Sequence, residues 1–125
     1  MNYVHKALYA FWSSFGIPAY LTGHVPDEAE LPYITFEVVD GEPFSSNYLT
    51  AIVWVKQNGA GNEIRASYLD KFKNAIPWDG TQLYLPDGML MLYRNGSNFL
   101  SYYDDPEDDT ILGGRVSYQV NYYHM

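Results

Sequence analysis

The sequence contains no cysteine, which excludes a disulfide framework and any metal site built from thiolates. Basic residues are few: seven Lys and Arg stand against 15 Asp and Glu, so the formal net charge is −8. Because affinity for nucleic acid comes mostly from basic side chains, we expect no direct, sequence-specific contact with DNA or RNA. Apolar runs stay well below the roughly 20 residues of a membrane-spanning helix, so no membrane contact is expected either.

Motifs for catalysis and cofactor binding are also missing. The three histidines, His5, His24 and His124, lie far apart, and none has a second ligand at metal-binding spacing. Residues 59–61 follow a predicted strand as a dinucleotide loop would, but the third glycine of that fingerprint falls on Ile64. We therefore expect no enzyme, no cofactor and no metal. A small enzyme with two carboxylates in a pocket is the weaker alternative.

Aromatic residues are abundant instead, at 18% of the chain with 13 tyrosines. Tyrosine is enriched at protein interfaces, where its ring packs and its hydroxyl stays in water. It also has a high β-propensity, so a plain strand position is the simpler explanation for any one of them. The excess over what a core needs favours an interaction surface.

The chain is expected to be organised around residues 48–76. The nearly continuous apolar run from Tyr48 to Val55 predicts a strand that is covered on both faces. After a glycine loop, Asn62 is expected to cap a helix that Pro77 ends. An apolar stripe is predicted to lie on the sheet, made of Ile64, Tyr68, Phe72, Ala75 and Ile76.

The remaining pattern predicts a single α+β domain over residues 1–125, with a mostly antiparallel sheet packed by two helices and a C-terminal β-meander. An N-terminal helix is indicated by helical spacing of Val4, Leu8, Phe11, Trp12 and Phe15, with Asn2 as its cap. Strands are predicted at residues 33–39, 81–85, 89–93 and 99–103, with turns at 40–43, 86–88 and Asn95-Gly96. Residues 99–103 should pair with the strand before them, and Gly113-Gly114 should form a bend. In the last strand, Val116, Tyr118, Val120 and Tyr122 should share one face.

Three stretches of the chain carry a resemblance to a known group. A helix closes at Phe15-Gly16-Ile17-Pro18-Ala19-Tyr20, and Leu31-Pro32-Tyr33-Ile34-Thr35-Phe36 opens a strand. The strand at residues 49–55 then leads into the helix at 62–76, and antiparallel strands finish the chain. This order resembles the small tail-completion proteins of long-tailed bacteriophages and prophages, the tail terminator or tail-to-head joining group.

The resemblance implies a structural virion protein, present in the host cytoplasm during assembly. Such proteins form a ring, usually of six subunits, that caps the tail tube and offers a docking face to head-connector proteins. The implied partners are therefore copies of itself, the tail tube protein and the head connector. A carbohydrate- or peptide-binding module rich in aromatics, or another head-tail neck component, is the alternative. Exposed turns and an acidic loop are the predicted interface positions: Asp87, Asn95, Asp104, Asp105, Glu107, Asp108 and Asp109.

Overall fold

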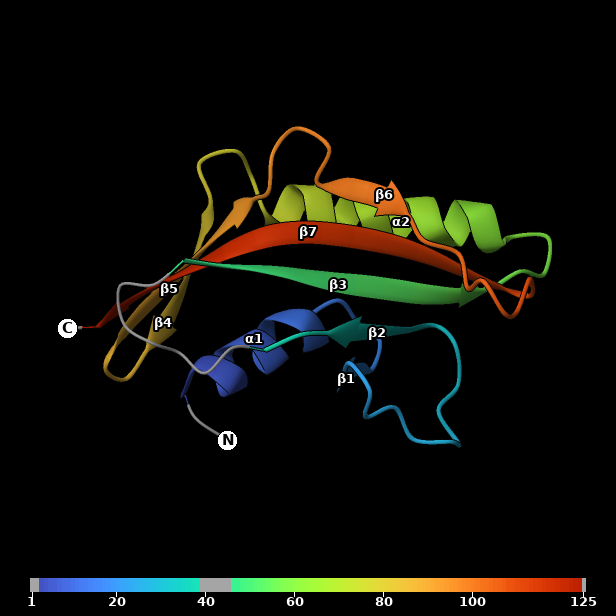
Figure 1. Cartoon of the computed structure of the whole chain (residues 1–125), viewed down its shortest axis with the longest axis horizontal. Helices are drawn as coiled ribbons and strands as arrows, with labels where there is room; N and C mark the ends of the chain where they lie inside the picture. Colours follow the sequence, from blue (N-terminus) through green and yellow to red (C-terminus); the bar gives the residue numbers. More distant parts are fainter. Residues whose placement is uncertain (1–2, 39–45, 125) are drawn as a thin grey trace.

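A computed structural model describes residues 3–38 and 46–124. The expected cap at Asn2 and the expected turn at 40–43 lie outside these residues. The described elements are α1 (Tyr3–Ser13), β1 (Ala19–Leu21), β2 (Tyr33–Phe36), β3 (Ser46–Lys56), α2 (Gly61–Ala75), β4 (Thr81–Leu85), β5 (Gly88–Arg94), β6 (Leu100–Tyr102) and β7 (Ile111–His124). The predicted α+β class is confirmed, with a curled, mostly antiparallel sheet and two helices (Figure 1). Neither described helix is long and apolar enough to cross a membrane.

The long strand β7 connects most of the sheet. The strand order is β1-β2-β3-β7-β5-β4, and β6 also pairs with β7. Along one edge, β7 pairs with all of β3, from Ser46 opposite Asn121 to Lys56 opposite Ile111. Its other edge is shared, because β5 pairs with Tyr118–His124 and β6 with Gly114–Val116. β1 pairs with β2 in the parallel direction.

The predicted pairing of residues 99–103 with the preceding strand is wrong. β6 pairs with β7 because the connection from β5 is wider than a two-residue turn and wraps around Ser117. The Asn95 amide donates to the Ser117 carbonyl (3.1 Å), and the Ser117 amide donates to the Phe99 carbonyl (2.7 Å). Asn95-Gly96 therefore begins a broader loop. The β4–β5 hairpin around residues 86–87 is confirmed.

Both helices pack on the same face of the sheet. The Trp12 ring of α1 lies 5.4 Å from the Phe72 ring of α2 and 5.5 Å from the Tyr118 ring of β7, measured between centroids. In Figure 1, β6 is drawn in front of α2 and β2 in front of α1. The core between helices and sheet includes the buried residues Val4, Leu8, Leu49, Ala51, Val53, Val55, Val116, Val120 and Tyr122. The predicted faces of the N-terminal helix and of the last strand are confirmed.

Two strand predictions need correction. β3 is buried on its inner face, but Tyr48 on the outer face is 66% exposed, so this strand is not covered on both sides. β2 ends at Phe36, and Thr35 is buried although it points away from the core side. The Trp54 indole covers Thr35 and donates a 3.0 Å hydrogen bond to its hydroxyl.

The buried face of α2 is displaced from the predicted stripe. Its buried residues are Gly61, Arg65, Leu69 and Phe72, whereas Ile64 is exposed. The helix begins at Gly61 with no side-chain cap, so the prediction that Asn62 caps it is wrong. The Asn62 side chain instead accepts a hydrogen bond from Arg65 (2.8 Å).

Gly113 and Gly114 lie inside β7 and make no bend. They continue the ladder opposite Trp54 and Val53. A Cβ atom on Gly113 would clash with the Tyr103 carbonyl, and one on Gly114 would approach Leu69 of α2 to 2.9 Å. These glycines are therefore required by close approach of neighbouring segments.

Candidate functional site

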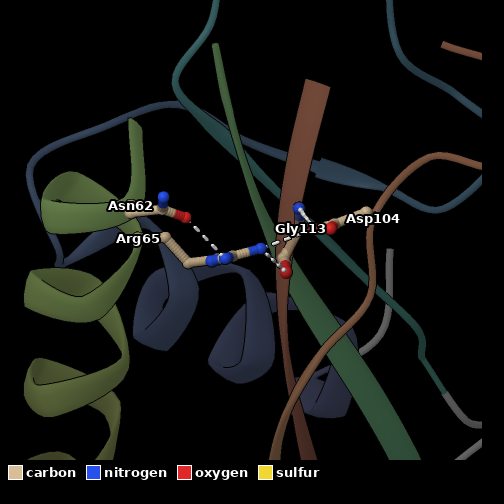
Figure 2. A network of polar contacts seen from close by, with 4 residues as sticks. All are labelled: Asn62, Arg65, Asp104 and Gly113. Carbon is tan, nitrogen blue, oxygen red and sulfur yellow. Dashed lines mark hydrogen bonds and ion pairs between the residues drawn. The ribbon is translucent and has the colours of Figure 1, made fainter. Parts of the chain in front are cut away.

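The acidic connection between β6 and β7 is fixed to the domain by Arg65 of α2 (Figure 2). An Asp104 carboxylate oxygen accepts a hydrogen bond from Arg65 Nη1 and another, at 3.3 Å, from the Gly113 amide. Arg65 also donates to the Gly113 carbonyl (3.4 Å), and its guanidinium lies 4.0 Å from the centroid of the Tyr102 ring. Asp104, predicted as an interface residue, therefore has a structural partner.

Arg65 is the residue that sequence reasoning missed. Its exposed fraction is 6%, although a charged residue on an amphipathic helix is normally placed toward solvent. The available signal was the helical spacing of Arg65, Leu69, Phe72 and Ile76. This face shares Phe72 and Ile76 with the predicted stripe and has Arg65 and Leu69 in place of Ile64 and Tyr68. Burial of this cation is possible because Asp104, Asn62 and the Gly113 carbonyl all accept from its guanidinium.

The rest of the acidic connection is shaped by its own carboxylates. Asp105 Oδ1 accepts from the Glu107 amide (2.9 Å), and Asp108 Oδ1 accepts from the amide (2.9 Å) and hydroxyl of Thr110. The hydroxyl and amide bonds of Thr110 lower the pKa of Asp108 below its usual value. Glu107 and Asp109 are exposed. Within residues 3–38 and 46–124, no group of three or more His, Asp or Glu side chains is arranged to hold a metal ion.

A hollow of about 250 Å³ lies between the acidic connection and the loop that joins β1 to β2. We call it the Trp54 hollow; its lining includes Trp54, Tyr33, Thr35, Thr22, Asp105 and Ile111. Trp54 and Tyr33 are opposite each other on β3 and β2. Tyr103 packs edge-on against Trp54 at 6.0 Å between centroids. The hollow therefore combines aromatic rings with a carboxylate.

The other predicted interface residues lie elsewhere. Asp87, in the β4–β5 turn, is half-buried and accepts a 2.9 Å hydrogen bond from the Tyr122 hydroxyl, with His124 Nε2 at 3.6 Å. Burial, and then this bond and the charge of Asp87, raise the pKa of Tyr122. Asn95 is exposed in the β5–β6 connection. In Figure 1 the β4–β5 turn and the β6–β7 connection lie at opposite ends of the molecule, so the predicted residues do not form one surface.

A further surface is the outward side of β3, β4, β5 and β7, away from both described helices. We call it the open sheet face. In the half of this side nearer the β4–β5 hairpin, strand alternation places Tyr48, Gln82, Tyr84, Met89, Met91, Tyr93, Gln119, Asn121 and Tyr123, and the name refers to these nine residues. The basic residues Lys56 and Arg115 lie on the same side, farther along β3 and β7. Tyr48 and Tyr84 are 66% and 80% exposed, and none of the nine residues is charged. A neutral, aromatic face is unusual in a chain whose net charge is −8.

Charge is unevenly distributed over the fold. All seven basic residues lie in helices or strands, whereas 11 of the 13 described acids lie in connections. Eight of those acids belong to the two connections that border the Trp54 hollow: Asp27, Glu28, Glu30, Asp104, Asp105, Glu107, Asp108 and Asp109. The open sheet face and this acidic end are thus chemically distinct surfaces. No protein-family model and no curated protein matches the sequence.

Proposed function

We propose that this chain is a structural virion subunit of the tail terminator or tail-to-head joining type, acting as a ring of copies on the tail tube. The observation that carries the proposal is the open sheet face. A sheet side that meets only water usually carries polar and charged residues, whereas the nine positions of the open sheet face, nearer the β4–β5 hairpin, include tyrosine and methionine but no charged residue. The order of elements on which the resemblance rests is compatible with the proposal.

A ring contact joins two different surfaces, so the open sheet face needs a distinct receiving surface. α1 provides a suitable one. Its exposed residues include Tyr3, Lys6 and Tyr9, and the helix contains no acid. Contact between these two surfaces avoids the repulsion that a net charge of −8 produces elsewhere. The tail tube protein and the head connector would meet other parts of the assembled ring.

Sedimentation across micromolar to millimolar concentration tests self-association. We expect the mass to rise from 14.3 kDa toward six times that value. A Tyr48→Lys, Tyr84→Lys double variant should stay at the monomer mass, because each lysine would be buried unpaired in the contact. Asn74→Lys, on the exposed surface of α2, is the matched control and should assemble. A wild-type chain that stays monomeric at millimolar concentration contradicts the proposal.

The absence of cysteine allows the two surfaces to be identified directly. Tyr9→Cys and Tyr84→Cys variants are mixed and treated with a short bis-maleimide. A heterologous contact gives cross-linked dimers in the mixture and none in either variant alone. Cross-linking of Tyr84→Cys with itself would indicate a twofold dimer instead. Asp108→Lys with Asp109→Lys tests the acidic connection, and an unchanged oligomer mass excludes it from the contact.

The second candidate is a small binding module. The Trp54 hollow favours it, because the partly exposed rings of Trp54 and Tyr33 could stack on sugars or on peptide side chains. A role as another head-tail neck component would use the same surfaces with different partners.

A further inference from the structure

The Trp54 hollow supports an inference that does not depend on ring formation. We propose that it is a recognition site for the guanidinium group of an arginine side chain presented by a partner protein. Within a particle, such a site would select which neighbouring component docks on the acidic end of this subunit.

The size of the hollow suits one side chain. Its volume of about 250 Å³ is below the roughly 300–1,000 Å³ of typical small-molecule sites. Trp54 and Tyr33 supply ring surface, while Thr22 and Thr35 supply hydroxyls. The Thr35 hydroxyl already accepts from the Trp54 indole, which fixes the orientation of that ring. A rigid aromatic wall is therefore present before any ligand binds.

The charge of the hollow favours a cation. Asp105 lines it, none of its described lining residues is basic, and the two connections around it contain eight acids. Asp105 Oδ1 accepts from the Glu107 amide, so Oδ2 is the atom that we assign to the ligand. The pKa of Tyr33 is raised by burial, then by Tyr20 and by the negative charge of Asp105, which agrees with a negative potential at this ring.

The protein already contains one contact of this kind within its own chain, an arginine that lies on an aromatic ring and donates to a carboxylate. Arg65 lies over the Tyr102 ring at 4.0 Å and donates to the Asp104 carboxylate. The next carboxylate along the chain, Asp105, is combined with Tyr33 and Trp54 in the hollow, with no cation of its own chain in the lining. Arg115, on the same side of the sheet, is directed to Tyr103 and Ser101.

Arginine fits better than lysine or a sugar. A planar guanidinium stacks on aromatic faces while it donates a charge-assisted hydrogen bond to a carboxylate oxygen, whereas an ammonium is a compact, strongly hydrated charge. A neutral sugar could stack on the rings but would gain no electrostatic attraction from the surrounding acids. These differences define the three probes of the test.

The experiment follows the indole N–H resonance of Trp54 by NMR while the intact chain is titrated with N-acetyl-arginine-amide. The neutral isostere, N-acetyl-citrulline-amide, and glucose are titrated in parallel. We expect a saturable shift with arginine and about fivefold to tenfold weaker binding of citrulline, because the ion pair and the cation–π contact are both lost. Trp78, which is exposed just after the C-terminal end of α2, serves as the internal control for nonspecific contact.

Two variants separate recognition from folding. Asp105→Asn keeps an acceptor for the Glu107 amide but removes the charge, and it should weaken arginine binding about fivefold to tenfold. Asp109→Asn, on the same connection but outside the hollow, should change binding less than about twofold. Equal binding of arginine and citrulline, or equal effects of the two variants, would overturn the proposal. A shift with glucose but not with arginine would overturn it in favour of a sugar site. None of these results changes the sedimentation test of the ring.

Discussion

Trp12 and Tyr118 lie 106 positions apart in the chain, and the Trp12 indole donates a 3.2 Å hydrogen bond to the Tyr118 hydroxyl in the core. Both side chains are fully buried, and the Trp12 ring also packs against Phe72 of α2. This one contact joins α1 to the long strand β7 and places it next to α2.

Replacing Tyr118 with Phe should lower the free energy of unfolding by about 1–3 kcal/mol, because the buried Trp12 indole loses its acceptor. Urea denaturation measures the change. Tyr84→Phe, at an 80% exposed tyrosine, should stay within about 0.5 kcal/mol of wild type. A Trp12→Phe, Tyr118→Phe double variant should lose less than the sum of the single losses. Strict additivity would mean that the hydrogen bond contributes nothing.

Alkaline pH should destabilise the fold through the same residue. Burial raises the pKa of Tyr118 well above the ordinary tyrosine value, the bond from Trp12 opposes this in part, and the charge of Glu37 adds to it. The stabilisation that Tyr118 provides is complete below about pH 10. Above that pH the free energy of unfolding falls, because the unfolded chain releases the tyrosine proton that the folded chain retains. Urea midpoints measured from pH 8 to 11 should show the stability gap between wild type and Tyr118→Phe shrinking above about pH 10. A constant gap would contradict the buried position of Tyr118.

Asp104 and Asp109 should differ in their effect on stability. Asp104→Ala removes the carboxylate from buried Arg65 and should cost about 1–2 kcal/mol, at the lower end for a charged hydrogen bond because Asp104 is half exposed. Asp109→Ala should cost less than about 0.5 kcal/mol. Chemical denaturation compares them, and limited proteolysis of residues 103–110 should accelerate in the first variant alone. Equal stability of both variants would show that the Arg65 contact is dispensable.

Replacing the two adjacent glycines of β7 with alanine should lower the free energy of unfolding by different amounts. Gly113→Ala places Cβ against the backbone carbonyl of Tyr103, so the β6–β7 connection must move, at a cost of about 3 kcal/mol or more. Gly114→Ala meets the flexible end of Leu69 and should cost about 1–3 kcal/mol. Thermal unfolding measures both, and Leu69→Val should recover part of the loss at Gly114 but none at Gly113. A lower cost at Gly113 than at Gly114 would contradict the packing described.

Local periodicity was enough to predict α1, the inner face of β7 and the β4–β5 hairpin. Each depends on neighbours in sequence: residues four apart in a helix, two apart in a strand, or a turn closed by two residues. The pairing of β6 was not accessible in this way, because the Asn95-Gly96 signal is local while the available edge belongs to β7. The outer side of β3 was misjudged because an apolar run does not reveal whether a second layer exists.

The candidate sites depended even more on distant parts of the chain. Arg65 is buried because Asp104 and Gly113, 39 and 48 positions away, accept its hydrogen bonds. The acidic connection was predicted as an interface from its exposure and charge alone, and this stays a prediction. Local composition did not indicate that Asp104, Asp105 and Asp108 each accept hydrogen bonds from the backbone or from α2. The Trp54 hollow brings together four separate segments, and no spacing in the sequence indicates it.

The position of β7 in the sheet affects how this chain folds during its synthesis. β3, β5 and β6 all pair with β7, yet β7 follows each of them in the chain. During synthesis these strands leave the ribosome before β7 does. Until β7 emerges, one edge of each remains unpaired and can aggregate with other chains. A nascent chain of this topology can complete the pairing of β3, β5 and β6 only after β7 has left the tunnel, so those strands stay open to wrong pairing until then.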